Sequence, residues 1–319
     1  MLPALEYPQA DDEVAGLLHG AGERLLTSHD LRQRRVAALD LLLQGEAGAA
    51  APGHSGLRLQ SELLIRAHWA CGAPAHTSTA RHYLETVVAA FAAVVCALEV
   101  LDELADGQES DLALALLGES IELVRGLPEP LAPRLLAHWG ALWTRCAAAQ
   151  TLDAALSAGP DLTVSQAIRV ATSSGLVTQW AVEAGAIVAD AAPGLVAPLA
   201  VFGRYLGTAQ KLLHALSPGA HRCGDLRRLS GNLTLAVAQD SGLAPTESEP
   251  GVLDRAVLRR RLVECDAPDY ARACADQCRR HAAEALRLFA GAGGNPTPLA
   301  GLLDLPPELR FVQMEDTQP

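Results

Sequence analysis

A long apolar segment that leads directly into acidic residues constrains the fold of this chain most. Residues 87–98 are 12 apolar residues in succession, and Glu99, Asp102, Glu103 and Asp106 follow them. Positions three, four and seven apart share a face of an α-helix, so these acids form one stripe about 10 Å long. The pattern predicts a buried helix that ends in mutually repelling carboxylates.

Repulsion among these carboxylates requires a compensating positive charge. Mg²⁺ takes one or two carboxylates and keeps its other coordination positions for water and phosphate oxygens. The stripe therefore indicates a metal that joins Asp102, Glu103 and Asp106 to a diphosphate. A helix end that enters solvent also carries acids, and the pattern leaves this alternative open.

The segment 102–106 reads Asp-Glu-Leu-Ala-Asp. It resembles the first aspartate-rich motif, Asp-Asp-x-x-Asp, of the trans-isoprenyl diphosphate synthase (polyprenyl synthetase) family, with Glu103 keeping the charge of the second place. The segment 202–210 is similar to the family helix that leads to the second aspartate-rich motif. In this chain that helix continues as Lys-Leu-Leu-His-Ala-Leu, so the paired aspartates are missing and the second motif is degenerate.

Basic residues that hold diphosphates in this family are only partly kept. The Gly-Lys-Arg-x-Arg-Pro segment corresponds to residues 56–61, which retain one arginine, and the Lys-Thr pair corresponds to Ser173 and Ser174. The segment from 225 is similar to Asp-Leu-x-x-Gly-Lys-x-Thr-Leu-Pro with two residues inserted. The resemblance implies these substrate-binding residues: Arg58, Gln60, Lys211, Asp225, Arg227 and Arg228. For the basic residues among them, a solvated position on the surface is the alternative interpretation.

The same resemblance implies a reaction. Asp102 and Asp106 would be the catalytic residues and, with Glu103, the ligands of Mg²⁺, which assists ionisation of an allylic diphosphate. The cation would then condense 1'-4 with isopentenyl diphosphate. Ala97 and Leu98, just before the acids, would form a chain-length pocket. The implied assembly is a homodimer or a heterodimer with another synthase.

Two other functions stay open. A class I terpene-cyclase-like enzyme needs only one allylic diphosphate, and Asn232 and Asp240 keep the ends of its Asn…Ser/Thr…Glu metal motif while Ala236 loses the middle. A non-catalytic partner subunit of a heteromeric prenyl synthase would show the loss of the second aspartates and of most basic ligands.

Composition indicates an all-α chain. Half of the residues are hydrophobic, only 4% are aromatic, and no segment alternates β-branched residues. We expect a single isoprenoid-synthase-like domain at 1–290, with about ten or more helices around a central cavity, and a Gly/Pro-rich tail at 291–319. The expected helices lie at 13–26, 32–44, 57–69, 82–106, 111–124, 131–158, 164–190, 200–216, 233–239, 252–264 and 270–290.

Charge and cysteine usage limit the partners. The net charge of -12 makes nucleic acid a poor partner. We expect no membrane span, because the 12-residue apolar run is shorter than the about 20 residues that a span requires. The N-terminus lacks a signal-peptide pattern, so we expect a cytoplasmic protein.

Cys274, Cys278 and His281 share a helix face, with Cys265 as a possible fourth zinc ligand; buried reduced thiols are the alternative.

Overall fold

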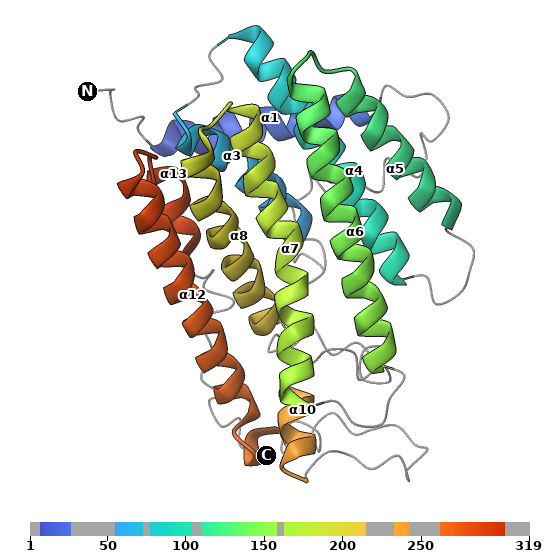
Figure 1. Ribbon diagram of the computed structural model, residues 1–319, viewed down its shortest axis with the longest axis vertical. Helices are drawn as coiled ribbons and strands as arrows, with labels where there is room; N and C mark the ends of the chain where they lie inside the picture. Colours follow the sequence, from blue (N-terminus) through green and yellow to red (C-terminus); the bar gives the residue numbers. More distant parts are fainter. Residues whose placement is uncertain are drawn as a thin grey trace, which may run out of the picture. The chain divides into compact units, whose positions relative to one another are not determined.

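A computed structural model of the chain describes residues 7–26, 55–72, 77–103, 110–157, 163–214, 233–242 and 262–303. These ranges contain ten α-helices, one 3-10 helix and no β-strand, which confirms the predicted all-α class (Figure 1). The helices are α1 (Tyr7–Leu26), α3 (Ser55–Ala70), α4 (Ser78–Glu103), α5 (Ser110–Arg125), α6 (Leu131–Ser157), α7 (Val164–Val188), α8 (Pro193–His214), α10 (Leu233–Asp240), α12 (Ala267–Gly291), α13 (Thr297–Ala300) and η1 (Gly301–Leu303). The helix predicted at 32–44, and most of that at 252–264, lies outside the described residues.

Contacts divide the chain into two compact units. The first comprises 1–142, 180–200 and 288–299, and the second comprises 143–179, 201–287 and 300–319. The predicted division into a domain at 1–290 and a tail at 291–319 stays a prediction. Within the first unit, Asn295 N donates a hydrogen bond to the carbonyl of Ala70 at 2.8 Å, and Leu299 is fully buried. The beginning of the predicted tail is therefore packed against α3.

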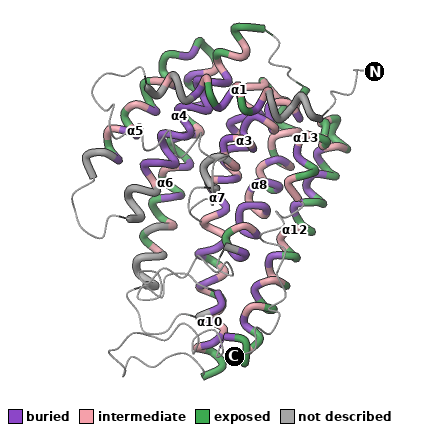
Figure 2. Tube along the Cα trace, turned by 180° about the vertical axis from the view of Figure 1, so that it is seen from behind, coloured by how far each residue is buried: buried purple, intermediate pink, exposed green. Residues whose placement is uncertain are grey.

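Helix α4 is the core of the first unit. Every residue from Leu84 to Ala97 is buried, and α1, α3 and α5 pack against it (Figure 2). A helix that is apolar nearly all round can be stable in water only when neighbouring helices cover it on several sides. The apolar run that dominates the sequence therefore fixes which helix becomes central.

We expected no stretch with the length and composition of a membrane span, and this expectation was wrong. Within the described residues, the segment Ser78–Leu98 of α4 reaches the required length and hydropathy, with a mean hydropathy of 1.4, because the apolar run outweighs the polar residues that precede it. Of this window, 78% is buried inside the structure. A buried core helix passes the same test, and the packing of α4 is that of a core helix.

Close helix contacts occur at glycines. In the first unit, a Cβ atom placed on Gly185 of α7 would lie 2.2 Å from the carbonyl oxygen of Leu64 on α3. In the second unit, a Cβ atom on Gly175 of α7 would lie 2.4 Å from the carbonyl oxygen of Arg204 on α8. Both distances are shorter than any real Cβ contact, so the helix backbones approach to a separation that only glycine permits.

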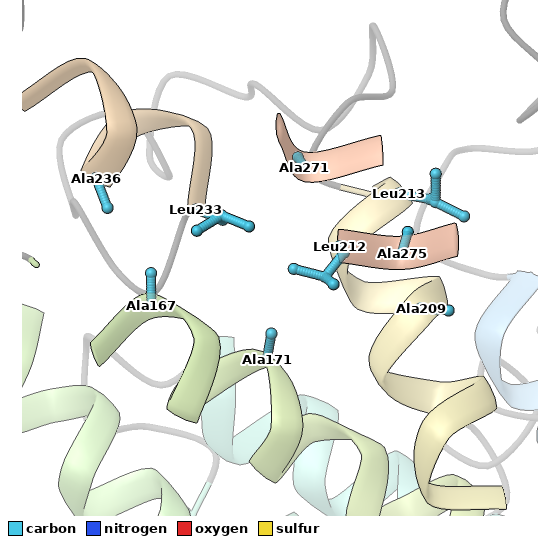
Figure 3. Close-up of a cluster of buried hydrophobic side chains, with 9 residues drawn as sticks. All are labelled: Ala167, Ala171, Ala209, Leu212, Leu213, Leu233, Ala236, Ala271 and Ala275. Atoms are coloured by element: carbon cyan, nitrogen blue, oxygen red, sulfur yellow. The ribbon is translucent and has the colours of Figure 1, made fainter. Parts of the chain in front are cut away.

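The second unit has its own small-residue core. Alanines and leucines from α7, α8, α10 and α12 form one buried cluster: Ala167, Ala171, Ala209, Leu212, Leu213, Leu233, Ala236, Ala271 and Ala275 (Figure 3). The small side chains allow these helices to pack closely.

Local interactions explain where α7 and α8 begin. Thr163 caps α7, directly before the helix predicted at 164–190: its Oγ1 accepts from Gln166 N at 3.3 Å, and Gln166 Oε1 accepts from Thr163 N at 2.9 Å. Helix α8 begins at Pro193, seven residues before the predicted start at 200. Proline is favoured at a first helical position because its missing N–H would have no helical partner there, and α8 also accommodates Pro198.

Candidate metal and diphosphate site

Helix α4 carries the predicted acids at its end. Asp102 and Glu103 are its last two residues, and Asp106 lies outside the described residues. Ala97 is fully buried and Leu98 is half-buried, about one turn before Asp102. The predicted chain-length pocket residues and two of the predicted metal ligands therefore follow one another on a single helix.

The position of these acids is electrostatically unfavourable without a cation. The C-terminal end of a helix bears the negative end of its macrodipole, where each acidic residue costs about 0.3–1 kcal/mol and basic residues are preferred. The last turn of α4 has no basic residue. A bound cation at this end would relieve both the dipole and the mutual repulsion of the carboxylates.

The other predicted substrate-binding residues lie on different elements. Arg58 and Gln60 are on α3, which packs against α4 in the first unit. Gln60 is half-buried, and its Oε1 atom is buried and has no hydrogen-bond partner among the residues that the structure describes. Lys211 is exposed on α8 and belongs to the second unit. Asp225, Arg227 and Arg228 lie outside the described residues.

The predicted magnesium site stays a prediction. In the part of the chain that the structure describes, no group of three or more His, Cys, Asp or Glu residues is placed to hold a metal ion. That part includes the backbone of Asp102 and Glu103, but neither their side chains nor Asp106. The site therefore rests on the spacing of the acids and on the end of α4 where they stand.

The structure favours packed, half-buried thiols over a zinc site at the cysteines and the histidine in and just before α12. Cys274 and Cys278 pack against the alanine and leucine cluster of the second unit, and burial raises the pKa of both thiols. The ring of His281 lies 4.9 Å from that of Tyr205, and its Nε2 atom is 2.9 Å from Gln277 Nε2. Cys265 Sγ donates to the carbonyl of Leu262 at 3.3 Å. These contacts use the four predicted zinc ligands for packing and local hydrogen bonds.

The serines at the position of the family Lys-Thr pair bond to their own helix. Ser173 Oγ donates to the carbonyl of Arg169 at 3.0 Å, and Ser174 Oγ donates to the carbonyl of Val170 at 3.2 Å. A hydroxyl has only one proton to donate, so in this arrangement neither serine offers a donor to a phosphate.

The structure contains an aromatic cluster that was not predicted, and it includes a residue of α4 that precedes the acids in the sequence. Phe91 of α4 lies 4.5 Å from Trp180 of α7 between ring centroids, and Trp180 lies 4.2 Å from Trp139 of α6 in an edge-on arrangement. Trp139 Nε1 donates to the buried Ser120 Oγ at 2.8 Å. The only sequence signal was the scarcity of aromatic residues, which does not reveal that three of them meet.

Comparison with known proteins relates the chain to others by structure alone, since neither a family model nor a curated protein matches its sequence. A geranylgeranyl pyrophosphate synthetase from the archaeon Geoglobus acetivorans is 17% identical with a TM-score of 0.69, covering 90% of this chain and 97% of that one. A polyprenyl synthase from Caulobacter crescentus, in complex with calcium and isoprenyl diphosphate, is 16% identical with a TM-score of 0.65 over 93% and 95% of the two chains. A geranylgeranyl pyrophosphate synthase from Corynebacterium glutamicum, in complex with isoprenyl diphosphate and magnesium, is 14% identical with a TM-score of 0.64 over 94% and 99%.

These matches define the class of fold. The chain has the fold of the geranylgeranyl and polyprenyl diphosphate synthases, and the predicted isoprenoid-synthase-like helical architecture is confirmed. The same fold is the one that the resemblance of residues 102–106 and 202–210 implied. At these sequence identities, the matches show the fold alone, and the reaction is inferred from the residues of the chain.

Proposed function

We propose that this chain is an isoprenyl diphosphate synthase-like transferase that ionises an allylic diphosphate with the help of Mg²⁺ and condenses it with isopentenyl diphosphate. The observation that carries the proposal is helix α4, which is buried from Leu84 to Ala97 and ends at Asp102 and Glu103 within a prenyl-synthase fold. An apolar helix that ends in carboxylates suits a substrate with a hydrocarbon tail and a diphosphate group, which a cation would join to the carboxylates.

The donor set fits the proposed cofactor. Carboxylate oxygens are hard ligands, and Mg²⁺ binds through one or two of them together with phosphate oxygens. Solved structures of this fold contain calcium or magnesium together with isoprenyl diphosphate. When bound, the ion would supply positive charge that stabilises the departing diphosphate.

The side chains of this protein would bind the cation, the diphosphate and the hydrocarbon tail. Asp102, Glu103 and Asp106 would hold the cation, and Arg58 of α3 would bind a diphosphate through charge-assisted hydrogen bonds. The buried face of α4 before the acids would receive the hydrocarbon tail and exclude water from the cation formed on it. The small side chain of Ala97 would leave depth for the tail next to Leu98.

A second candidate, ionisation of a single allylic diphosphate as in class I terpene cyclases, is supported by one observation. Ser173 and Ser174 bond to carbonyls of their own helix and replace the Lys-Thr pair. Each charge-assisted bond to a phosphate is worth about 1.5–3 kcal/mol, so the loss of several would weaken the binding of a second diphosphate by orders of magnitude.

Product analysis separates the candidates. Purified protein is incubated with Mg²⁺ and an allylic diphosphate, with and without labelled isopentenyl diphosphate. A longer labelled prenyl diphosphate supports the transferase, and a hydrocarbon from the allylic substrate alone supports the cyclase. If neither product forms and a second synthase becomes active only when this chain is added, the chain is a non-catalytic partner and both enzyme proposals are wrong.

Metal binding gives a readout that does not need turnover. Mn²⁺ in place of Mg²⁺ can be titrated by electron paramagnetic resonance in the presence of pyrophosphate. Binding should be lost in Asp102→Asn and kept in Asp266→Asn, which changes an exposed carboxylate just before α12, outside the acidic stripe.

A further inference from the structure

Helix α12 carries two cysteines whose side chains lie on the same face. Cys274 and Cys278 are four residues apart, a spacing that makes two side chains neighbours on a helix surface. Both pack against the alanine and leucine cluster of the second unit (Figure 3), and both are half-buried free thiols. The two thiols therefore share one apolar environment, and neither is completely closed off from solvent.

The two sulfur atoms are close enough to affect each other's charge. Burial raises the pKa of Cys278, and the neighbouring Cys274 raises it further. Burial also raises the pKa of Cys274, while a hydrogen bond from the Tyr270 hydroxyl acts in the opposite direction. A cation between the two sulfurs would stabilise both in the deprotonated form, because thiolates next to a positive charge are favoured.

The spacing of this pair does not suit a disulfide. Cβ atoms four residues apart on a helix are separated by about 5–6 Å, whereas a disulfide requires a Cβ separation of about 3.5–4.5 Å. An ion bound about 2.3 Å from each sulfur, as in a zinc–thiolate bond, would instead hold the sulfurs up to about 4.6 Å apart. A regular helix can therefore accommodate a bridging ion more readily than a sulfur–sulfur bond.

The donor set selects a soft ion of low coordination number. Among the described residues, no third His, Cys, Asp or Glu completes a metal-binding group with the pair. Cys265 and His281 contact Leu262 and Gln277 instead. Two thiolates fill only half of the four-ligand shell of structural zinc, whereas Cu(I) is a soft ion that thiolates select.

We propose that Cys274 and Cys278 form a two-coordinate site for a soft monovalent metal ion, Cu(I). Binding forms two metal–sulfur bonds, breaks two S–H bonds and releases two protons to solvent, without a change of oxidation state. The complex keeps one negative charge, which the hydrogen bond from Tyr270 stabilises. The proposal is independent of the Mg²⁺ site and of the proposed catalytic activity.

The first test is a titration of the reduced full chain with Cu(I), in the absence of oxygen and against a chromophoric Cu(I) chelator. The wild type should take one ion per chain from the chelator, and Cys274→Ala or Cys278→Ala should lower the affinity at least tenfold. Cys71→Ala is the matched control, because Cys71 is also a half-buried thiol but belongs to the first unit. A wild type that takes up no ion, or pair variants that bind as tightly as Cys71→Ala, would overturn the proposal.

Thiol protection gives a measurement that needs no substitution in the packed pair. Wild-type protein is treated with iodoacetamide with and without one equivalent of Cu(I), and the alkylated cysteines are identified by mass spectrometry. Bound Cu(I) should slow the alkylation of Cys274 and Cys278 at least tenfold and leave the rate at Cys71 unchanged. Equal protection of Cys71, or no protection of the pair, would contradict the proposed site.

The coordination number separates this site from a zinc site. Co²⁺ in a tetrahedral shell of thiolates absorbs visible light strongly, and the wild type should not give such a spectrum. Cys265→Ala should bind Cu(I) as tightly as the wild type, because Cys265 is not part of the pair. A tetrahedral Co²⁺ spectrum that Cys265→Ala abolishes would show a site with more ligands, and the two-coordinate proposal would be wrong.

Discussion

The carboxylate of Glu85 lies directly over Gly20: a Cβ atom at this glycine would stand 2.6 Å from Glu85 Oε1. Arg24 Nη2 donates to Glu85 Oε2 at 2.8 Å, and Arg81 Nε donates to Oε1 at 2.9 Å. Burial acts to raise the pKa of Glu85, but the bonds from Arg24 and Arg81 outweigh it and hold the pKa below its usual value. This carboxylate thus joins α1 to α4, and it needs the absence of a side chain at Gly20.

Gly20→Ala should lower the stability of the protein. The new methyl group would displace the Glu85 carboxylate from its two arginines, and overpacking of this kind costs about 1–3 kcal/mol. The measurement is the free energy of unfolding in urea.

Gly140→Ala is the matched control for Gly20→Ala. A Cβ atom at Gly140 would meet no atom of the described residues within 4 Å, and alanine is the better helix former, so this variant should be unchanged or up to about 1 kcal/mol more stable. If the two variants unfold at the same urea concentration, the contact between Gly20 and Glu85 does not contribute to stability.

Gly185→Ala should be the more damaging glycine substitution. Its Cβ atom would lie 2.2 Å from the carbonyl oxygen of Leu64, and a backbone atom cannot rotate away as the Glu85 side chain can. We expect a loss of about 3 kcal/mol or more, measured by the same urea titration. Gly194→Ala is the control, because its Cβ atom would meet no atom within 4 Å in the part of the chain that the structure describes. A Gly185→Ala protein as stable as this control would show that α3 and α7 can separate without cost.

Stability should fall in acid because of His68. This side chain is 2% exposed, and its burial lowers its pKa to about 4, against a smaller opposing effect of the Gly185 backbone. Since the pKa is lower in the folded than in the unfolded state, the stabilisation is complete above about pH 6.5 and is lost as the pH falls towards 4. The loss should reach about 3 kcal/mol.

His68→Leu is the variant that isolates this effect. It should remove most of the decrease in unfolding free energy between pH 7 and pH 4, measured in urea at several pH values. Equal pH dependence in the wild type and in His68→Leu would assign the acid sensitivity to other groups.

The acidic stripe should control the Mg²⁺-dependent reaction. Asp102→Asn and Asp106→Asn each remove a charge from the proposed cation site, and we expect the turnover rate to fall by about 10³-fold, equivalent to about 4 kcal/mol. Glu103→Asp should keep most of the activity, because the charge is retained. Rates are measured by incorporation of labelled isopentenyl diphosphate.

Asp266→Asn serves as the control for these rates, since it changes the same kind of side chain at an exposed position just before α12. If Asp266→Asn is as inactive as Asp102→Asn, the loss of activity does not depend on the acidic stripe. Full activity in Asp102→Asn would exclude the acidic stripe from catalysis.

Much of the helical architecture is predictable because it depends on local patterns. The apolar run before Leu98 predicts a central helix, and α4 is the core of the first unit. A helix is predicted from residue 164, and α7 begins there, where Thr163 forms a capping box with Gln166. The early start of α8 at Pro193 differs from the predicted start at 200, because a proline that would interrupt a helix interior suits a first helical turn.

The candidate site is predictable only in part. The spacing of Asp102, Glu103 and Asp106 is a property of the sequence, and that spacing alone suggests metal chemistry. The positions of Arg58 on α3 and of Lys211 on α8 in the second unit are properties of packing. No local pattern shows that residues on separate helices do or do not share a site.

The sequence by itself determined that the chain is helical, that one helix must be central and that this helix ends in acids, because spacing along a helix decides which side chains share a face. Only the tertiary structure decided that Glu85 meets Arg24, 61 residues away, that Trp180 meets Phe91, and that α5 keeps Leu114 and Ile121 exposed. Such contacts depend on how several helices fill space together, and no single segment holds that information.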